Sequence, residues 1–223
     1  MDITNSVAVV TGANRGLGRH FAAQLLERGA KVYAGARVPG SIDLPGAIPL
    51  QLDITDPASI ERAAKVASDA TLLINNAGTY LNQPLIGGDL DLIRQEMETH
   101  YFGTLGVTRA FVPVLEANGG GAILNVLSVL SWWHPANAGA YSAAKAAGWA
   151  LTRAVRDELA PRGIAVSALH VGYMDTDMAA TIPADQKTDP ALVARQALDG
   201  LAEGNPEILA DDVTRTVKAG LGS

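Results

Sequence analysis

A tyrosine and a lysine stand four residues apart in the segment Tyr141-Ser142-Ala143-Ala144-Lys145. On a helix, side chains with this spacing share one face, so we expect the Lys145 ammonium near the Tyr141 phenol. A neighbouring cation favours phenolate over phenol, and lowering a tyrosine pKa from about 10 toward 7 takes roughly 4 kcal/mol of anion stabilisation. The pair is therefore a candidate proton donor and acceptor, although the same spacing occurs in many helices as an ordinary surface pair.

Ser128 favours the catalytic interpretation. It directly follows the apolar run Ala122–Leu127, which we predict to be the fifth strand of a sheet. Ligands of open α/β sheets bind beyond the carboxyl ends of the strands, so the Ser128 hydroxyl is expected to hold a substrate oxygen beside Tyr141. Ser128, Tyr141 and Lys145 are therefore candidate catalytic residues.

Short apolar runs alternate with longer amphipathic segments along the chain, which is typical of β-α units around a parallel sheet buried on both faces. The predicted strands are Val7–Val10, Val32–Ala36, Ile48–Leu52, Leu72–Asn75, Ala122–Leu127, Ala165–His170 and Glu207–Leu209. The predicted helices are Leu17–Arg28, Ala58–Ala67, Leu90–Ala117, Ala140–Ala160, Pro190–Glu203 and Asp211–Leu221. Residues 38–46 are rich in proline and glycine and are predicted to form a loop. We expect a single α/β domain over residues 1–223, doubly wound, with a mostly parallel seven-stranded sheet and helices on both faces.

Three glycines lie between the first predicted strand and the first predicted helix, in the sequence TGANRGLG of residues 11–18. Glycines let the backbone turn tightly and approach a pyrophosphate, while the helix N-terminus supplies free N–H groups and about half a positive charge. Such glycines also mark ordinary strand-to-helix turns, but the flanking strand and helix and the second strand beyond them favour a dinucleotide site. The candidate cofactor-binding residues of this loop are Gly12, Asn14, Arg15, Gly16, Leu17 and Gly18.

The residue after the second predicted strand indicates which dinucleotide fits. An NAD site has Asp or Glu there for the adenosine ribose, whereas an NADP site offers a cation to the 2′-phosphate. Here the residue is Arg37, and Arg15 in the glycine loop is placed to reach the same phosphate. The missing acid and the present base predict NADP(H), against the alternative that Arg37 is a solvated surface residue.

The 223 residues carry a formal net charge of −6, and the 17 basic residues are scattered along the chain. We expect no nucleic-acid partner, because such binding uses a concentrated basic surface. The chain has no cysteine, which excludes a thiolate metal site, and we predict no bound metal. No secretion signal is recognisable, and no apolar run approaches the roughly 18 residues of a membrane span. The expectation is a cytoplasmic protein with no membrane association.

Taken together, these segments resemble the short-chain dehydrogenase/reductase family over essentially the entire chain. Residues 11–18 match its Thr-Gly-x-x-x-Gly-x-Gly loop, and residues 75–78 match its Asn-Asn-Ala-Gly segment after the fourth strand. Ser128 precedes Tyr141 at the family's usual interval, and Asp53 follows the third strand where a similar Asp contacts adenine. The resemblance implies a Rossmann fold, NADP(H) and hydride transfer between nicotinamide C4 and a carbonyl or alcohol carbon.

The resemblance also implies a role for each candidate. Tyr141 is the general acid in reduction and the base in oxidation, Lys145 lowers its pKa and holds the nicotinamide ribose, and Ser128 orients the carbonyl. Residues 171–176 resemble the family's Pro-Gly-x-x-x-Thr segment, where Thr176 would contact the carboxamide. The cofactor-binding residues implied outside the glycine loop are Arg37, Asp53, Ile54, Asn76, Ala77, Gly78, Tyr141, Lys145, Gly172 and Thr176.

Two positions depart from the family pattern. Val171 replaces the proline, which is expected to loosen that loop. His100 stands three residues before Gly103, where members usually carry an Asn that organises a water path from the lysine to solvent. His100 is a candidate for the same relay, for a titrating group with its own pH dependence, for a sign of weakened catalysis, or for a packed structural residue. We include it among the candidate catalytic residues.

The loops limit the substrate only broadly. Trp132, Trp133 and His134 are predicted to wall the pocket, with Tyr173 and Met178 opposite, which favours an apolar or aromatic ketone unless some of these side chains serve the core or an oligomer contact. The segment 172–189 is short for a lid, so we expect an open site.

Two other functions stay open. Epimerases and dehydratases of nucleotide-sugars use the same tyrosine and lysine, but resemble Gly-x-x-Gly-x-x-Gly in the loop and need an extra substrate domain. A non-catalytic NADP(H)-sensing protein typically lacks the tyrosine or the lysine.

We expect a small-molecule carbonyl or alcohol substrate. The resemblance also implies a homodimer or homotetramer paired through the family's fourth and fifth helices, and the small residues of the helix that carries Tyr141 permit the close approach of another helix.

Overall fold

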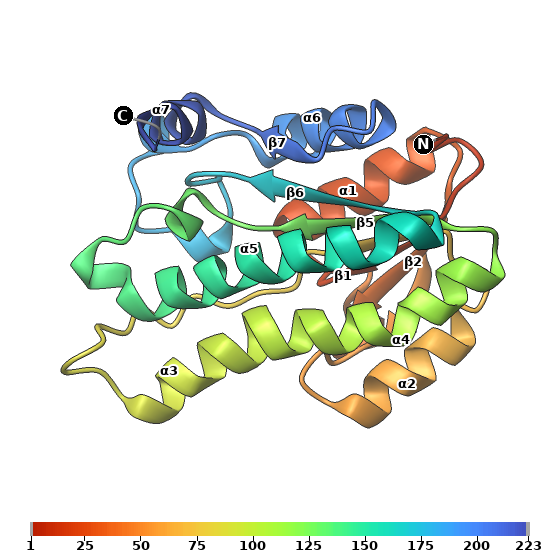
Figure 1. Cartoon of the computed structure of the whole chain (residues 1–223), viewed down its shortest axis with the longest axis horizontal. Coiled ribbons are helices and arrows are strands. Elements are labelled where there is room, and N and C mark those ends of the chain that lie inside the picture. The colour runs from red at the N-terminus through yellow and green to blue at the C-terminus, as the bar shows by residue number, and fades with distance from the viewer. Residues whose placement is uncertain (1, 222–223) are drawn as a thin grey trace.

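A seven-stranded sheet forms the centre of the molecule (Figure 1). The computed structural model describes residues 2–221. The strands are β1 Val7–Thr11, β2 Lys31–Ala36, β3 Ile48–Gln51, β4 Leu72–Asn75, β5 Gly121–Val126, β6 Ile164–His170 and β7 Glu207–Leu209. Their order across the sheet is β3-β2-β1-β4-β5-β6-β7, and each neighbouring pair is parallel. The predicted fold class is confirmed, and the sheet is parallel throughout.

Apolar side chains on both faces of the strands explain why the sheet lies inside. β4 is buried at every position, and the register aligns Val9 of β1 with Leu73 and Val10 with Ile74. Successive side chains of a strand point to opposite faces, so Val9 and Val10 belong to two separate cores. A sheet of this kind needs helices on each face.

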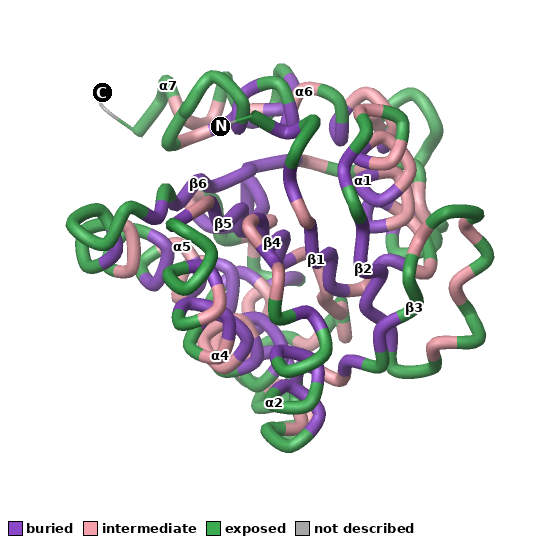
Figure 2. Tube along the Cα trace, turned by 90° about the vertical axis from the view of Figure 1, so that its right-hand side faces the viewer, coloured by how far each residue is buried: buried purple, intermediate pink, exposed green. Residues whose placement is uncertain are grey.

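Helices cover both faces of the sheet. On one face lie α1 Gly16–Glu27, α6 Pro190–Ala202 and α7 Asp212–Gly220. On the other lie α2 Pro57–Val66, α4 Thr104–Ala117 and α5 Gly139–Leu159, with α3 Leu90–Met97 leading into α4. In Figure 2 the buried residues follow the strands and the inward sides of these helices.

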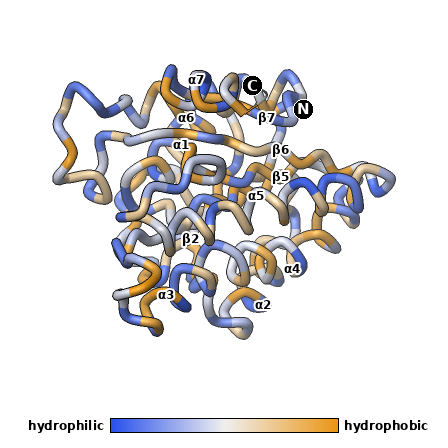
Figure 3. The backbone as a smooth tube through the Cα atoms, turned by 60° about the vertical axis from the view of Figure 1, so that its left-hand side comes forward, coloured by the Kyte–Doolittle hydropathy of each residue, from blue (hydrophilic) through white to orange (hydrophobic). Residues whose placement is uncertain are grey.

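Each core is anchored by large side chains from a central helix. Phe21 and Leu25 of α1 fill one core, and Phe111 and Leu115 of α4 fill the other; all four are fully buried. Burying such a side chain contributes about 1.5 to 3 kcal/mol. Hydrophobic and hydrophilic colours alternate along the helices in Figure 3, as expected when one side of a helix faces the sheet and the other faces water.

Within residues 2–221, aspartate side chains cap four of the helices, α2, α3, α6 and α7. Asp56 accepts the N–H of Ala58 at 2.9 Å before Pro57 opens α2, and Asp189 caps α6 in the same way. Asp211 caps α7 by accepting the Thr214 N–H at 2.7 Å. A cap of this type is worth about 1 kcal/mol.

The predicted helix over Leu90–Ala117 is present without a break, but it is not α-helical throughout. A π-helical turn, Glu98–Gly103, separates α3 from α4. A π turn holds one more residue than an α turn, so it rotates the residues before it relative to those after it. Glu96, Thr99 and His100 are buried in this arrangement. The apolar periodicity continues on both sides of the turn, which is why the sequence gives no sign of it.

Two further sequence expectations concern the loop at 38–46 and the membrane. The loop is present and contains one short 3-10 turn, Pro39–Ser41. Within residues 2–221, no helix combines the length and the apolar character that a membrane crossing needs.

Candidate active site

The segments predicted to form the site follow β1, β4, β5 and β6, which are adjacent in the sheet. In a parallel sheet the carboxyl ends of neighbouring strands meet at one edge. The chain order reverses between β1 and β4, and such a switch point opens a crevice at that edge. The structure therefore brings together the glycine loop, residues 76–81, Ser128 and residues 171–176.

The glycine loop lies directly against the segment after β4. Thr11 Oγ1 accepts the N–H groups of Asn76 and Ala77, both at 2.9 Å, and Asn76 Nδ2 donates to the carbonyl oxygens of Thr11 and Gly12. A Cβ on Gly18 would collide with the Gly12 carbonyl oxygen and with Asn76 Nδ2, so no larger residue fits there. The two segments form one rigid floor for a ligand.

The first turn of α1 is open to an anion. Gly12 has φ of 64°, which a side chain disfavours and which turns the chain into the helix. No side chain caps the helix, and its first turn carries no acid, so its leading N–H groups face the crevice without a protein partner from a cap. Leu17 is buried beneath the loop, whereas Arg15 is exposed and its guanidinium pairs with Asp177 at 3.1 Å.

Arg37 and Asp53 lie on the same side of the crevice, after β2 and β3. Arg37 is exposed, and within residues 2–221 no carboxylate lies within ion-pair distance of it. Burial tends to raise the pKa of Asp53, but hydrogen bonds from the Thr55 N–H and hydroxyl and the charge of Arg37 lower it overall. Ile54, another predicted contact, has its side chain in the core below α4.

Ser128, Tyr141 and Lys145 come together as predicted. Ser128 follows β5, and its Oγ accepts the Leu130 N–H at 3.1 Å. Lys145 Nζ donates to the Val126 carbonyl oxygen at 2.9 Å and lies 5.5 Å from the centre of the Tyr141 ring. Ser128 and Lys145 are buried, and Tyr141 is half-buried in the first turns of α5.

The protein alone does not lower the pKa of Tyr141. Burial raises this pKa, the charge of Glu96 raises it further, and a hydrogen bond with Ser128 acts in the opposite direction. Burial also lowers the pKa of Lys145 to about 8, which Glu96 opposes. The sequence expectation considered the lysine but not the desolvation and the carboxylate, and these two dominate in this arrangement.

Glu96 is the member of the site that the sequence analysis missed. Its fully buried carboxylate lies 3.2 Å from His100 Nε2, one helical turn away. Burial lowers the pKa of His100, as does the charge of Lys145, while Glu96 and the Thr79 backbone oppose this. The available signal was the spacing of four between an acid and a histidine on one helix. The structure thus places His100 beside the catalytic group rather than in a remote core.

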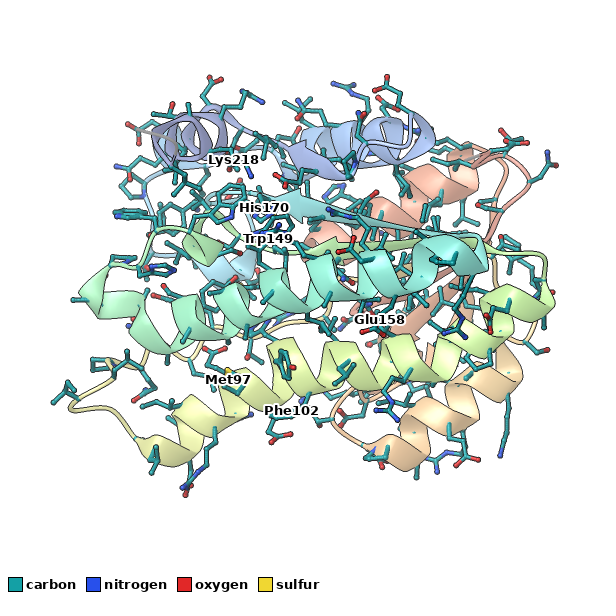
Figure 4. All side chains as sticks on the ribbon, in the orientation of Figure 1. Met97, Phe102, Trp149, Glu158, His170 and Lys218 are labelled. Atoms are coloured by element: carbon teal, nitrogen blue, oxygen red, sulfur yellow. The ribbon has the colours of Figure 1, made fainter. Side chains whose placement is uncertain are left out.

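Trp132 packs against His170 instead of lining the predicted pocket. Its ring stacks on His170 with 3.8 Å between centroids, and Trp149 and Lys218 complete the cluster. Figure 4 shows Trp149, His170 and Lys218 one above another, from α5 through the end of β6 to α7. Trp133 and His134 remain exposed. The prediction that Trp132 walls the pocket is therefore replaced by a packing role behind Ser128.

The segment after β6 is held by its first two residues. The Val171 carbonyl oxygen accepts the Val129 N–H at 3.0 Å, and the Gly172 N–H donates to Asp211 at 2.6 Å. These bonds fix the loop that valine was expected to loosen. Thr176 lies against Gly16 of the glycine loop, on the ligand side of the crevice. Tyr173 and Met178 are about half exposed, at 49% and 50%.

Known proteins share this sequence pattern. The profile of the short chain dehydrogenase family matches residues 6–187. Cis-4-hydroxycyclohexanecarboxylate dehydrogenase of Sinomonas cyclohexanicum is 36% identical over 220 residues, covering 93% of this chain and 87% of that protein. A 3-oxoacyl-acyl-carrier-protein reductase of Vibrio cholerae is 31% identical over 198 residues, covering 84% and 81%.

A solved structure shares the fold closely. The short chain dehydrogenase from Burkholderia cenocepacia in complex with NADP is 41% identical and matches with a TM-score of 0.96. The match covers 100% of this chain and 95% of that one, so it includes every strand that contributes to the candidate site.

Proposed function

Because the chain belongs to the short-chain dehydrogenase family, we propose that it is an NADP(H)-dependent oxidoreductase that interconverts a carbonyl compound and an alcohol. The observation that carries the proposal is the meeting of Ser128, Tyr141 and Lys145 at the edge where the glycine loop opens. An alcohol donor, a phenol and an ammonium are the groups that proton transfer at a carbonyl oxygen requires.

The residues of the crevice fit NADP(H). The open first turn of α1 suits the pyrophosphate, and the exposed cation of Arg37 suits the 2′-phosphate. Asp53 has one carboxylate oxygen engaged by Thr55, which leaves the other for adenine. The NADP bound in the Burkholderia structure agrees with the cofactor predicted from Arg37.

The proposed chemistry divides between cofactor and protein. NADPH, when bound, supplies the hydride for the carbonyl carbon. Ser128 Oγ accepts the Leu130 N–H, so its own proton can turn from the Tyr141 oxygen to the carbonyl oxygen of the substrate. Tyr141 gives its proton to the same oxygen, and its raised pKa keeps it protonated for that step. Lys145 donates one N–H to the Val126 carbonyl oxygen and has two more that can bind the ribose hydroxyls.

The substrate we propose is an apolar cyclic or aromatic ketone, or the matching alcohol. Tyr80, Trp133, Tyr173 and Met178 are partly exposed and belong to the segments that surround the catalytic groups. Aromatic side chains in these positions favour a ring over a charged chain. The Sinomonas relative is named for a hydroxylated cyclohexane ring that also carries a carboxylate, which supports a substrate with a ring.

We further propose a single-domain cytoplasmic protein that pairs into a homodimer or homotetramer through α4 and α5. The exposed Phe102 beside α4 supports this, because half of its surface (51%) faces solvent on a helix that carries Gly106 and Ala110 nearby. Light scattering at micromolar concentration is expected to give a dimer or tetramer, and a stable monomer would contradict it.

A panel of ketones tests the proposed function. NADPH oxidation is followed by absorbance with cyclic, aromatic and open-chain ketones, and the alcohol product is identified by mass spectrometry. We expect turnover with ring ketones and faster reaction with NADPH than with NADH. Tight NADPH binding without turnover of any ketone or alcohol would favour a cofactor-sensing protein instead.

A further inference from the structure

Glu96 is a carboxylic acid sealed inside the protein beside the candidate catalytic residues. Its side chain has no exposed surface, although it stands on α3 among solvent-facing acids such as Asp91 and Glu98. Oε1 accepts the Leu81 N–H at 2.6 Å, and Oε2 lies 3.1 Å from the Thr79 hydroxyl. A buried carboxylate is costly without such donors, so these contacts are what allow it to stay inside.

The contacts of Glu96 hold one wall of the site. Thr79 and Leu81 flank Tyr80, whose ring meets the Tyr141 ring edge-on with 5.2 Å between centroids. The His100 ring meets Tyr141 in the same manner at 5.1 Å. Loss of the Glu96 contacts would therefore release the two rings that pack on the proton donor.

His100 is held between Glu96 and the backbone of Thr79. Its Nε2 lies 2.9 Å from the Thr79 carbonyl oxygen and 3.2 Å from Glu96. The Thr79 N–H also lies 3.3 Å from Nε2, so all three contacts converge on one ring nitrogen. A Cβ on Gly78 would lie 2.6 Å from the His100 ring, so the segment after β4 closes over this histidine.

The surroundings of Glu96 indicate a negative charge. The Leu81 N–H and the Thr79 hydroxyl both donate to it, one to each carboxylate oxygen, which is the pattern that suits a carboxylate. The titratable groups that face it are His100 from the π-helical turn, Tyr80 from the segment after β4, and Tyr141 and Lys145 from α5. The helices α3 and α5 pack side by side, as Figures 1 and 4 show, so a cation on α5 lies within reach of the carboxylate.

We propose that Glu96 is a positioning residue: its carboxylate fixes residues 79–81 and His100 against Tyr141, and its buried charge acts on Lys145 across the contact between α3 and α5. The consequence for catalysis rests on the proposed function. The charge relation between Glu96 and Lys145 does not, because it belongs to the protein whatever the substrate is.

The charge of Glu96 raises the pKa values of both Lys145 and Tyr141. Burial lowers the pKa of Lys145 to about 8, and Glu96 raises it. Burial raises the pKa of Tyr141, and Glu96 raises it further. Replacing the charge with an amide, Glu96→Gln, is therefore expected to lower both pKa values. In carbonyl reduction both groups act in their protonated forms, so the alkaline limb of the kcat profile should move to lower pH, by about one unit.

The test uses the titration of Lys145 itself, which needs no substrate. The chain has five lysines, so 13C-lysine labelling gives few Cε resonances, and Lys145→Met identifies the one that titrates near pH 8. We expect this titration to move to lower pH in Glu96→Gln and to stay in place in Glu98→Gln, which removes an exposed acid two residues along. If the resonance titrates at the same pH in the wild type and in Glu96→Gln, the proposal is overturned.

A second variant covers the case in which Glu96→Gln fails to fold. Glu96→Asp keeps the charge but shortens the reach toward residues 79–81. We expect its Lys145 titration to stay near the wild-type pH while kcat falls about tenfold. A titration that drops in Glu96→Asp, or a kcat equal to that of the wild type, would contradict the proposal. Where ring ketones are turned over, the kcat profile of Glu96→Gln must also show the shifted alkaline limb that Glu98→Gln lacks. Absence of turnover in the wild type would count against the proposed function alone.

Discussion

The two ends of the candidate active site hold their charges in opposite surroundings. At the cofactor end, Arg37 is exposed, and the ion pair between Arg15 and Asp177 joins side chains that are 71% and 77% exposed. At the catalytic end, Glu96 and Lys145 are buried. Exposed pairs contribute about 0 to 1 kcal/mol and are screened by salt, whereas buried charges shift the pKa values of their neighbours. We call the exposed cofactor end the open end and the buried catalytic end the closed end. Charges at the open end can therefore select a ligand, while those at the closed end set the proton chemistry.

Two histidines sharpen the comparison within the closed end. His100 Nε2 lies 3.2 Å from Glu96 and 2.9 Å from the Thr79 carbonyl oxygen. His170 faces no carboxylate: Nδ1 lies 3.3 Å from the Ser128 carbonyl oxygen, Nε2 is buried without a partner, and burial lowers its pKa to about 3. The first ring belongs to a polar network beside the proton donor. The second is a neutral ring that packs behind Ser128.

The largest effect is expected from Tyr141→Phe, at the point where the closed end does its chemistry. The change removes the proton donor and keeps the ring, so kcat should fall by about 10² to 10⁴ while NADPH binding stays largely intact. Tyr101→Phe is the matched control, because Tyr101 packs on Phe102 in the π-helical turn. Steady-state kinetics and fluorescence titration measure the two quantities. Near-native kcat in Tyr141→Phe would mean that another group donates the proton.

The next largest effect is expected at acid pH, where the neutral, buried His170 lowers the free energy of unfolding. Its pKa falls from 6.5 in the unfolded chain to about 3 in the folded protein. Between pH 6.5 and 3, His170 is protonated in the unfolded chain but neutral in the folded protein. The unfolded state therefore binds more protons, and the free energy of unfolding declines as the pH falls through this range. The full loss is on the order of 5 kcal/mol.

Urea unfolding at several pH values isolates this contribution. His170→Phe keeps the stack on Trp132 and cannot be protonated, so its stability should depend less on pH than that of the wild type. The difference is expected to grow by about 1.4 kcal/mol per pH unit below 6.5. His134→Phe changes an exposed histidine and should follow the wild type. Parallel curves for the wild type and His170→Phe would show that His170 is protonated as easily in the folded state as in the unfolded one.

At the open end, Arg37→Asp is expected to shift the cofactor preference from NADPH toward NADH. One lost charged hydrogen bond is worth about 1.5 to 3 kcal/mol, or roughly ten- to a hundredfold in NADPH affinity. The new carboxylate adds repulsion toward the phosphate and offers an acceptor to the free ribose hydroxyls of NADH. Fluorescence titration of both cofactors checks this, with Arg195→Asp on α6 as the control. A preference that does not move would make Arg37 an ordinary surface residue.

The smallest effect is expected from Asp177→Asn, which releases Arg15 from its exposed ion pair. Because such a pair is worth little, NADPH affinity should rise by no more than about threefold at low salt, and the gain should disappear at high ionic strength. Asp185→Asn, in the same segment after β6, is the control. A gain that persists in high salt would show that the Arg15–Asp177 pair behaves like a buried one.

The segments of the open end meet where the sequence places them, because the features that define them are local. A glycine loop between strand and helix, an arginine after β2 and a serine after β5 are defined by their place along the chain. The strand order then brings them to one edge.

The closed end was predicted only in part, because its properties depend on burial. Glu96 is one of several acids in an amphipathic segment, and the π-helical turn decides that it faces inward. Trp132 was expected to line the pocket because nothing in the sequence shows that it stacks on His170. The direction of the Tyr141 pKa shift likewise follows from desolvation and Glu96, which spacing alone does not reveal.

Transfer of deuterium from NADPH labelled at C4 tests the central claim most directly. A ring ketone is reduced with each C4-labelled form of the cofactor, and the alcohol is examined by mass spectrometry and NMR. The account predicts that one of the two forms delivers a single deuterium to the carbinol carbon. An alcohol without deuterium from either form, or with deuterium at another position, would contradict direct hydride transfer at this site.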